Sequence, residues 1–278
     1  MSSATEYRDK HYVAPPIGRA KEHPLKRGDE FELNLTVPSK NSDPRSRPVP
    51  FIPVTAGSSR TRVQLLDGLQ TGLGHFSQVW TARIVAAPET TLIFKIIQPS
   101  MCYCDGEWKN DVHPDDLAGN EAWAYEHLKE KQGLYVPYFF GFHQIKTPSK
   151  EEAWVLVLEH IPGPTLTTVA KSKSWDDIYR SCELGFNLVR EITNIGLLLH
   201  DIRGPNFILT GPPGAQQVVG IDFQPMTVIA PTHDLVHVAH MREHEFFNVM
   251  LDHFSAEDCE KMLKWAQEKF PAGAYIWG

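Results

Sequence analysis

The pattern of hydrophobic and polar positions divides the chain into three regions, with changes near residues 60 and 160. Between these points, apolar runs rich in β-branched and aromatic residues predict strands over 62–66, 76–84, 91–97, 136–142 and 153–158. Pro88-Glu89-Thr90 predicts a turn, and 114–132 has the spacing of a helix. This region is therefore expected to be rich in strands, with one helix.

The third region is predicted to be mainly helical. Ser174 precedes apolar residues at helical spacing and is followed three residues later by Asp177, a loose form of the capping box. Helices are also expected over 233–252 and over 256–269, where Ser255 and Asp258 repeat the capping pattern.

A small hairpin is expected within 204–222, where two short apolar runs flank Gly211-Pro212-Pro213-Gly214. A strand-rich region followed by a helical one predicts an α+β protein of two lobes with a cleft between them.

The first region, residues 1–60, is rich in proline and charge. The alternating stretch 31–37 predicts one strand, and the remainder is expected to be an extended arm or a disordered tail. The predicted organisation is an extension over 1–60, a strand-rich lobe over 61–160 and a helical lobe over 161–278.

Composition narrows the class of protein. Lys and Arg number 27 against 34 Asp and Glu, so a net charge of −7 provides no overall field for nucleic acid or an anionic membrane, although a local basic patch is not excluded. The chain has no apolar run near the length of a membrane span and does not begin with a secretory pattern. Four cysteines do not form a disulfide framework. We expect a soluble cytoplasmic protein in a reducing compartment.

A glycine-rich turn containing Gly72 and Gly74 lies between the first two predicted strands of the second region. Glycine allows backbone N–H groups to approach phosphate oxygens closely, although an ordinary glycine hairpin is the commoner explanation of such a turn. A strand follows it, unlike a Rossmann turn, and no Gly-Lys-Ser/Thr closes it, unlike a P-loop.

Two charged residues interrupt apolar surroundings. Lys95 stands alone in the strand 91–97, where burial is costly unless the ammonium is paired; the alternative is an edge-strand lysine that reaches solvent. Glu121, early in the predicted helix, can pair with Lys95 and hold its ammonium group toward a phosphate. Glu126 is the rival partner for Lys95. The alternative for Glu121 is an ordinary solvated helix glutamate.

Three further polar residues form the most specific pattern. Asp201 and Asn206 are five residues apart in a loop, and Asp222 ends the second apolar run of the hairpin. Asn206 and Asp222 can provide the oxygen ligands that hard divalent cations need, which leaves Asp201 to accept a hydroxyl proton. In isolation, a turn without chemistry is the commoner explanation of Asp-x4-Asn.

The joint order of these motifs over about 65–225 resembles the protein kinase superfamily. The sequence Leu-His-Asp-Ile-Arg-Gly-Pro-Asn over 199–206 is most similar to kinase-like proteins abundant in filamentous fungi. The resemblance implies a reduced bilobal protein kinase-like fold with a β-rich N-lobe and a shortened helical C-lobe. It also implies transfer of the γ-phosphoryl group of ATP, with Mg²⁺, to a hydroxyl of a protein or of a small molecule.

The resemblance also assigns residues to roles. Lys95, held by Glu121, would orient the phosphates, Asp201 would be the catalytic aspartate, and Asn206 and Asp222 would bind Mg²⁺. Arg203 would lie near the transferred phosphoryl group. The remaining ATP contacts would come from Gly72, Gly74, Ser77 and Val79 over the phosphates, and from Leu158, the Glu159 carbonyl and the Ile161 N–H around the adenine.

Several features depart from the kinase pattern. His200 replaces an arginine that commonly contacts activation-loop phosphates, Gln224 replaces the glycine after Asp222-Phe223, and no Ala-Pro-Glu follows. The change at Gln224 and the missing Ala-Pro-Glu favour a pseudokinase, a nucleotide-binding or protein-interaction module, as the alternative function. The retention of all five polar residues favours activity.

His233, His237, His240 and His244 follow one another at steps of four, three and four residues, which places them on one helical stripe. A metal site or a cationic face is one hypothesis for them, and an ordinary polar helix face is the other.

Overall fold

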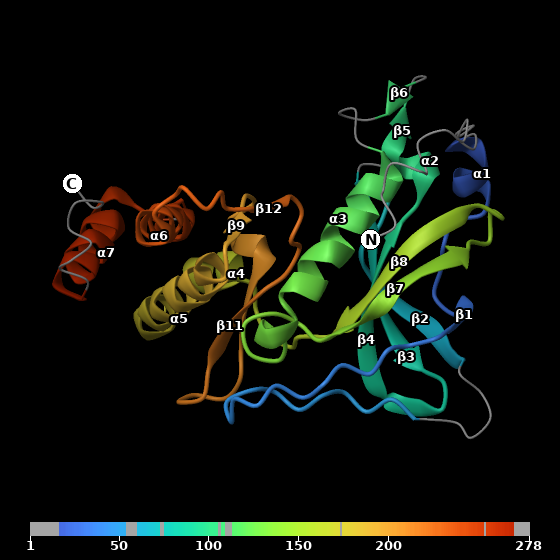
Figure 1. The fold of residues 1–278 in the computed structure, drawn as a ribbon, viewed down its shortest axis with the longest axis horizontal. Helices are drawn as coiled ribbons and strands as arrows, with labels where there is room; N and C mark the ends of the chain where they lie inside the picture. Colours follow the sequence, from blue (N-terminus) through green and yellow to red (C-terminus); the bar gives the residue numbers. More distant parts are fainter. Residues whose placement is uncertain are drawn as a thin grey trace. The chain divides into compact units, whose positions relative to one another are not determined.

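The computed structural model describes residues 17–53, 60–72, 75–104, 107–108, 113–172, 174–252 and 254–269. These residues form a mixed α+β protein with largely antiparallel strand pairing, which confirms the predicted α+β class (Figure 1). The chain divides into two compact units. Unit 1 contains the described parts of 1–34, 54–118 and 142–157, and unit 2 contains those of 35–53, 119–141 and 158–278.

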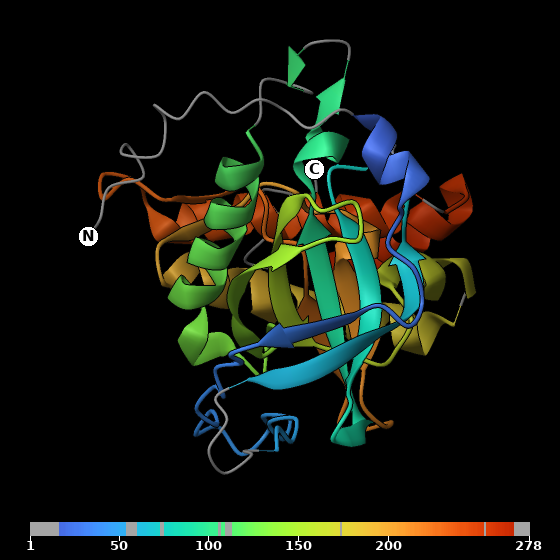
Figure 2. The ribbon, with the colours of Figure 1, turned by 90° about the vertical axis from the view of Figure 1, so that its right-hand side faces the viewer.

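Unit 1 contains most of a six-stranded sheet with the order β1-β2-β3-β4-β8-β7, whose strands are seen side by side in Figure 2. Its strands are β1 (Glu30–Leu33), β2 (Thr61–Gln70), β3 (Gln78–Ile84), β4 (Ala87–Ile97), β7 (Phe139–Lys146) and β8 (Glu152–Glu159). Alternation along β4 buries Leu92, Phe94 and Ile96 completely, so the period-two pattern of the sequence supplies this core.

The sheet corrects one sequence prediction. The turn between β3 and β4 lies at residues 85–86, where Ile84 pairs with Ala87, and not at 88–90. Pro88 and Glu89 lie instead near the start of β4, with exposed side chains. Proline is tolerated near a strand start, so Pro88 does not mark the turn.

The other elements of unit 1 are short: α1 (Ile17–Glu22), α2 (Pro99–Cys102), β5 (Tyr103–Cys104) and β6 (Glu107–Trp108). The helix α3 (Pro114–His127) begins in unit 1 and continues into unit 2, where the 3-10 turn η2 (Lys129–Lys131) follows it. The helix expected over 114–132 therefore ends earlier, and 119–141, expected in the strand-rich lobe, belongs to unit 2.

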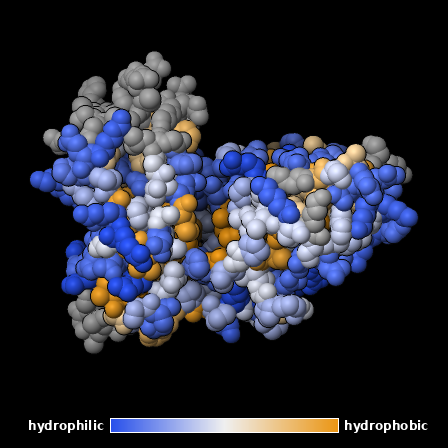
Figure 3. All heavy atoms as spheres, turned by 180° about the vertical axis from the view of Figure 1, so that it is seen from behind, coloured by the Kyte–Doolittle hydropathy of each residue, from blue (hydrophilic) through white to orange (hydrophobic). Residues whose placement is uncertain are grey.

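Unit 2 is mainly helical. Its helices are α4 (Leu166–Ser172), α5 (Trp175–Asn194), α6 (Leu235–Leu251) and α7 (Ala256–Lys269), with a 3-10 turn, η3 (Gly204–Asn206). Two small antiparallel sheets pair β10 (Phe207–Thr210) with β11 (Gln217–Gly220), the predicted hairpin, and β9 (Leu197–Leu199) with β12 (Met226–Val228). The surface over α7 is mostly hydrophilic (Figure 3, right-hand end).

The core of unit 2 is aromatic and depends on a close approach of α5 and α6. Phe246 on α6 packs edge-on against Phe207, with ring centroids 4.9 Å apart. A Cβ on Gly185 of α5 would lie 2.0 Å from Cζ of Phe246, so only glycine permits this packing.

The two helix starts predicted from a serine cap differ in whether the serine side chain makes the capping hydrogen bond. Ser255 caps α7 as predicted, because its Oγ accepts a hydrogen bond from Asp258 N at 3.2 Å. Ser174 occupies the cap position of α5, but its side chain makes no capping hydrogen bond, so that part of the prediction is wrong. Within the described residues, no helix combines the length and the apolar character needed to cross a membrane.

Residues 35–53 form an arm on unit 2, and β1 is shorter than the strand expected over 31–37. Thr36 N donates to Phe140 O at 2.8 Å, and Asn41 Nδ2 donates to Glu130 O and Gln132 O. This part of the first region is therefore an ordered arm.

Candidate functional site

The polar cluster of the segment between β9 and β10 is built around Asp201. Its Oδ2 accepts hydrogen bonds from Arg203 Nη2 at 2.5 Å and from Asn206 Nδ2 at 2.9 Å, and Asn206 Nδ2 also donates to the Asp201 carbonyl at 3.1 Å. A Cβ on Gly204 would lie 2.4 Å from Thr167 Oγ1, so glycine lets this loop pack against α4. The loop thus holds Asp201, Arg203 and Asn206 together.

The hairpin of β10 and β11 brings the chain back beside the loop that holds Asp201 and Asn206. In its register Phe207 pairs with Gly220, and Ile221 N donates to the main-chain oxygen of Asn206 at 2.8 Å. Asp222 follows directly, with a φ of 59° that few side chains other than Asp and Asn adopt readily. Backbone strain of this kind is common where side-chain direction matters to function.

The negative charge of Asp222 acts on Arg203, in the loop that holds Asp201. The pKa of the Arg203 guanidinium is raised, first by its hydrogen bond to Asp201 and then by the negative charges of Asp201 and Asp222, while partial burial opposes the shift. Asp201, Arg203 and Asp222 therefore lie within electrostatic range of one another.

The helix α3 meets the same segment in unit 2. Tyr125 packs edge-on against Phe223 with ring centroids 5.2 Å apart, and both side chains are buried. Burial raises the pKa of Tyr125 well above its usual value, and the charges of Glu121 and Asp222 raise it further. Glu121 is fully buried one helical turn before Tyr125, so the Tyr125 hydroxyl lies within electrostatic range of both Glu121 and Asp222.

The predicted site residues of unit 1 lie on or beside β3 and β4. Lys95 is 7% exposed and pairs in register with Val79, so it does not extend freely into solvent. Ser77 is buried beside the start of β3. Gly72 is exposed and has a φ of 104°, which favours glycine, whereas Gly74 lies outside the described residues.

The end of β8, where the sequence predicts adenine contacts, carries an ion pair between Glu159 and the arm. Leu158 and Ile161 are buried, and the Glu159 carboxylate receives Arg47 Nε and Nη2 at 2.8 Å each. Tyr138 N also donates to Glu159 Oε2, at 3.0 Å. The prediction for Glu159 concerned its backbone carbonyl, and the structure assigns its side chain to the arm.

Sequence reasoning missed Arg47. Its other N–H groups donate to Leu134 O, Val136 O and Gln217 Oε1, so all five guanidinium donors are used. An arginine in a proline-rich segment carries no local signal of such contacts, because its partners are 87 to 170 residues away in sequence.

The histidine stripe is only partly helical. His233 precedes α6, whose start is capped by Asp234 through a hydrogen bond from Val236 N to Oδ1 at 2.9 Å. His237, His240 and His244 lie within α6. Across the described ranges, no group of three or more His, Cys, Asp or Glu side chains is arranged to hold a metal ion.

Comparison with known proteins adds no assignment: no family model matches the chain, and no curated protein sequence matches it. The geometry of these residues is therefore the evidence for function.

Proposed function

We propose that the chain is an ATP- and Mg²⁺-dependent phosphotransferase with a bilobal protein kinase-like fold, which moves the γ-phosphoryl group to a hydroxyl of a protein or small-molecule acceptor. The observation that carries the proposal is the double role of Asn206. Its side-chain nitrogen is bound to Asp201, and its main-chain oxygen is bound to Ile221, next to Asp222. One residue thus connects the proposed base and the second proposed metal ligand.

The donor set fits a magnesium ion. Because Asn206 Nδ2 donates to Asp201, the opposite end of the amide, Oδ1, is directed elsewhere, and it accepts no hydrogen bond from any described residue. Mg²⁺ is commonly held by one or two protein oxygens together with substrate phosphates. Asn206 Oδ1 and the Asp222 carboxylate would hold the ion, which when bound neutralises charge on the phosphates.

Asp201 is arranged to receive a hydroxyl group. Arg203 and Asn206 both donate to Oδ2, whereas Oδ1 accepts no hydrogen bond within the described part of the chain. With the carboxylate fixed through one oxygen, the other can orient an acceptor hydroxyl and take its proton. The Arg203 side chain is 63% exposed and would add positive charge beside the transferred phosphoryl group.

The remaining roles follow the kinase resemblance. Lys95 and Glu121 would form the pair that orients the α- and β-phosphates. Their burial supports this role, because a buried charge of either sign is costly unless it is paired. Gly72 and its neighbours would cover the phosphates, and the segment from Leu158 to Ile161 would contact the adenine.

The test follows ADP formation by purified protein with Mg²⁺ and ATP labelled at the α-phosphate, with water as the acceptor of the γ-phosphoryl group, and compares wild type with Asp201→Asn and with Asp252→Asn as the matched control. Asp252 is an exposed aspartate of unit 2 at the end of α6. We expect ADP formation by wild type and by the control, and its loss in Asp201→Asn with ATP affinity retained. ATP binding without ADP formation in all three proteins favours the pseudokinase, and no ATP binding overturns both functions.

A further inference from the structure

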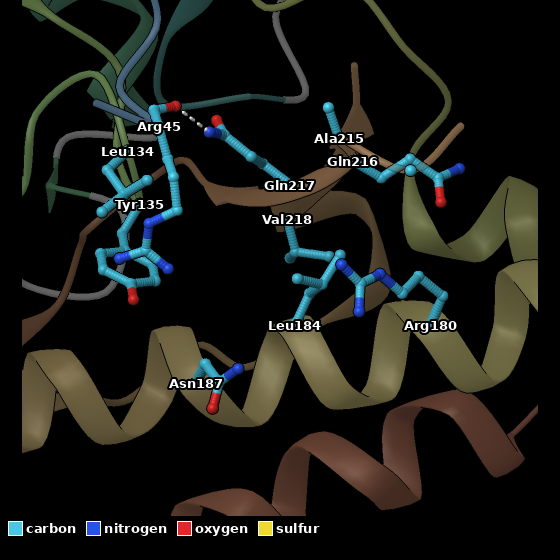
Figure 4. Close-up of a pocket in the computed structure, with 11 residues that line it drawn as sticks. Arg45, Leu134, Tyr135, Arg180, Leu184, Asn187, Ala215, Gln216, Gln217 and Val218 are labelled. Atoms are coloured by element: carbon cyan, nitrogen blue, oxygen red, sulfur yellow. Dashed lines mark hydrogen bonds between the residues drawn. The ribbon is translucent and has the colours of Figure 1, made fainter. Parts of the chain in front are cut away.

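A cavity of about 280 Å³ opens in unit 2 between the arm, the segment before β7, α5 and the hairpin (Figure 4). Gln217 and Val218 of β11 form part of its wall. It lies at the turn end of the hairpin, whereas Asp222 follows the other end. The three residue steps from Gln217 to Gly220 span about 10 Å of strand. The cavity is therefore separate from the proposed catalytic residues.

The charge of the lining is positive. Among the described residues that line the cavity, two are arginines, Arg45 and Arg180, and none is a carboxylate. The Arg45 guanidinium is already ion-paired, since its Nε and Nη2 donate to the two carboxylate oxygens of Asp43 at 3.0 and 2.6 Å. Any additional anion would therefore bind principally to Arg180.

Arg180 retains its hydrogen-bonding capacity. It donates no hydrogen bond to any residue that the structure describes, and its nearest carboxylate oxygen is Glu183 Oε2 at 3.5 Å. The other oxygen of Glu183 is paired with Lys269 at 2.9 Å. The Arg180 guanidinium points into the cavity in Figure 4 and its side chain is 43% exposed, so it is accessible to a ligand.

The same helix face supplies apolar and neutral polar contacts. Arg180, Leu184 and Asn187 are at positions i, i+4 and i+7 of α5, and they form one stripe beneath Val218 in Figure 4. Tyr135 lies beside Arg45, on the side of the cavity away from Arg180 in Figure 4, and adds a phenol hydroxyl to the wall. The wall thus combines one available cation, amide and phenol groups, and an apolar surface.

We propose that this cavity binds a small organic anion, with its acid group on Arg180 and its apolar body against Leu184. A guanidinium binds a carboxylate or phosphate through paired, charge-assisted hydrogen bonds. The size of the cavity and its walls on several sides suit a small molecule. This site is independent of the proposed phosphotransferase function.

The experiment measures binding of phenyl phosphate to the full chain by calorimetric titration, with benzyl alcohol as the uncharged probe. The variants are Arg180→Gln, Arg180→Lys, and Lys264→Gln, which removes one positive charge from an exposed position on α7. We expect saturable binding of phenyl phosphate, at least tenfold weaker in Arg180→Gln, less weakened in Arg180→Lys and unchanged in Lys264→Gln.

Benzyl alcohol is expected to bind more weakly, with no dependence on residue 180. Because the Arg180 side chain is substantially exposed, its variants should retain the wild-type circular dichroism, which confirms that each titration reports a folded protein. The proposal is overturned if folded wild type does not bind phenyl phosphate, if Arg180→Gln binds it equally well, or if Lys264→Gln weakens it as much.

Discussion

Replacement of Arg47 by methionine provides a direct test of how the arm stabilises unit 2. The Arg47 and Glu159 side chains are only 14% and 6% exposed, so the substitution leaves a buried carboxylate without its cation. It also removes the donors to Leu134 O, Val136 O and Gln217 Oε1. Removing one partner of a buried ion pair costs about 3–5 kcal/mol, a large share of a typical free energy of unfolding of about 5–15 kcal/mol.

A second comparison separates the ion pair from the hydrogen bonds. Glu159→Gln keeps an acceptor for Arg47 and for Tyr138 N, so we expect a smaller loss than in Arg47→Met. In the double variant the two losses should not add, because the second change removes the uncompensated carboxylate. The coupling free energy is expected to be about 1–3 kcal/mol, as for residues in direct contact.

The assay is equilibrium unfolding in urea, followed by circular dichroism, with the free energy of unfolding extrapolated to water. Arg27→Met is the control, because its ion pair with Asp67 is exposed on both sides, at 71% and 66%, and should contribute less than about 1 kcal/mol. If Arg47→Met loses no more stability than Arg27→Met, the arm does not stabilise unit 2 through this ion pair.

Three other substitutions or modifications test the packing and the proposed chemistry. Asn206→Ala should lower ADP formation by more than about tenfold and raise the Mg²⁺ concentration needed for half-maximal rate, because a metal ligand is lost. An unchanged Mg²⁺ dependence would refute the assignment. Gly185→Ala should reduce the free energy of unfolding by up to about 2 kcal/mol, since overpacking against Phe246 costs about 1–3 kcal/mol and the gain in helix propensity returns about 1 kcal/mol; thermal unfolding measures it, and a stabilised variant would contradict the packing. Burial raises the pKa of the Cys182 thiol well above its usual range, so iodoacetamide at pH 8 should label it only on unfolding, as followed by mass spectrometry; rapid labelling of the native protein would show that Cys182 is accessible.

Local patterns predicted the elements well where each element depends on its own residues. The range of α7 and the β10–β11 hairpin agree with the sequence prediction, because an amphipathic helix with a serine cap and a pair of apolar runs around a Gly-Pro turn are specified within a few residues. The position of the β3–β4 turn was wrong because a proline near a strand start has the same composition signal as a turn.

Long-range contacts could not be predicted from such patterns. The role of Arg47 depends on carbonyl groups around Tyr135, on Glu159 and on Gln217, and their sequence separations follow no periodicity. The predicted boundary of the helical lobe was wrong for the same reason, because 35–53 and 119–141 belong to unit 2 through tertiary contacts. The left-handed backbone of Asp222 was also not predictable, since this position is occupied by an aspartate and not by a glycine.

The proposed catalytic cluster lies between these two cases, local patterns and long-range contacts, because a local loop and a hairpin together determine its geometry. The spacing of Asp201 and Asn206 allows their hydrogen bond within one loop. The hairpin fixes the rest: its turn uses positive φ angles at Gly211 and Gly214, and the resulting register opposes Phe207 and Gly220. Since side chains alternate along a strand, a register shifted by one residue would direct β11 side chains to the opposite face and break the bond from Ile221 N to Asn206 O. Asp222 therefore lies near Asn206 only because the hairpin has this length and register. For this reason the spacing between the two motifs predicts their proximity, whereas no single residue of either motif does.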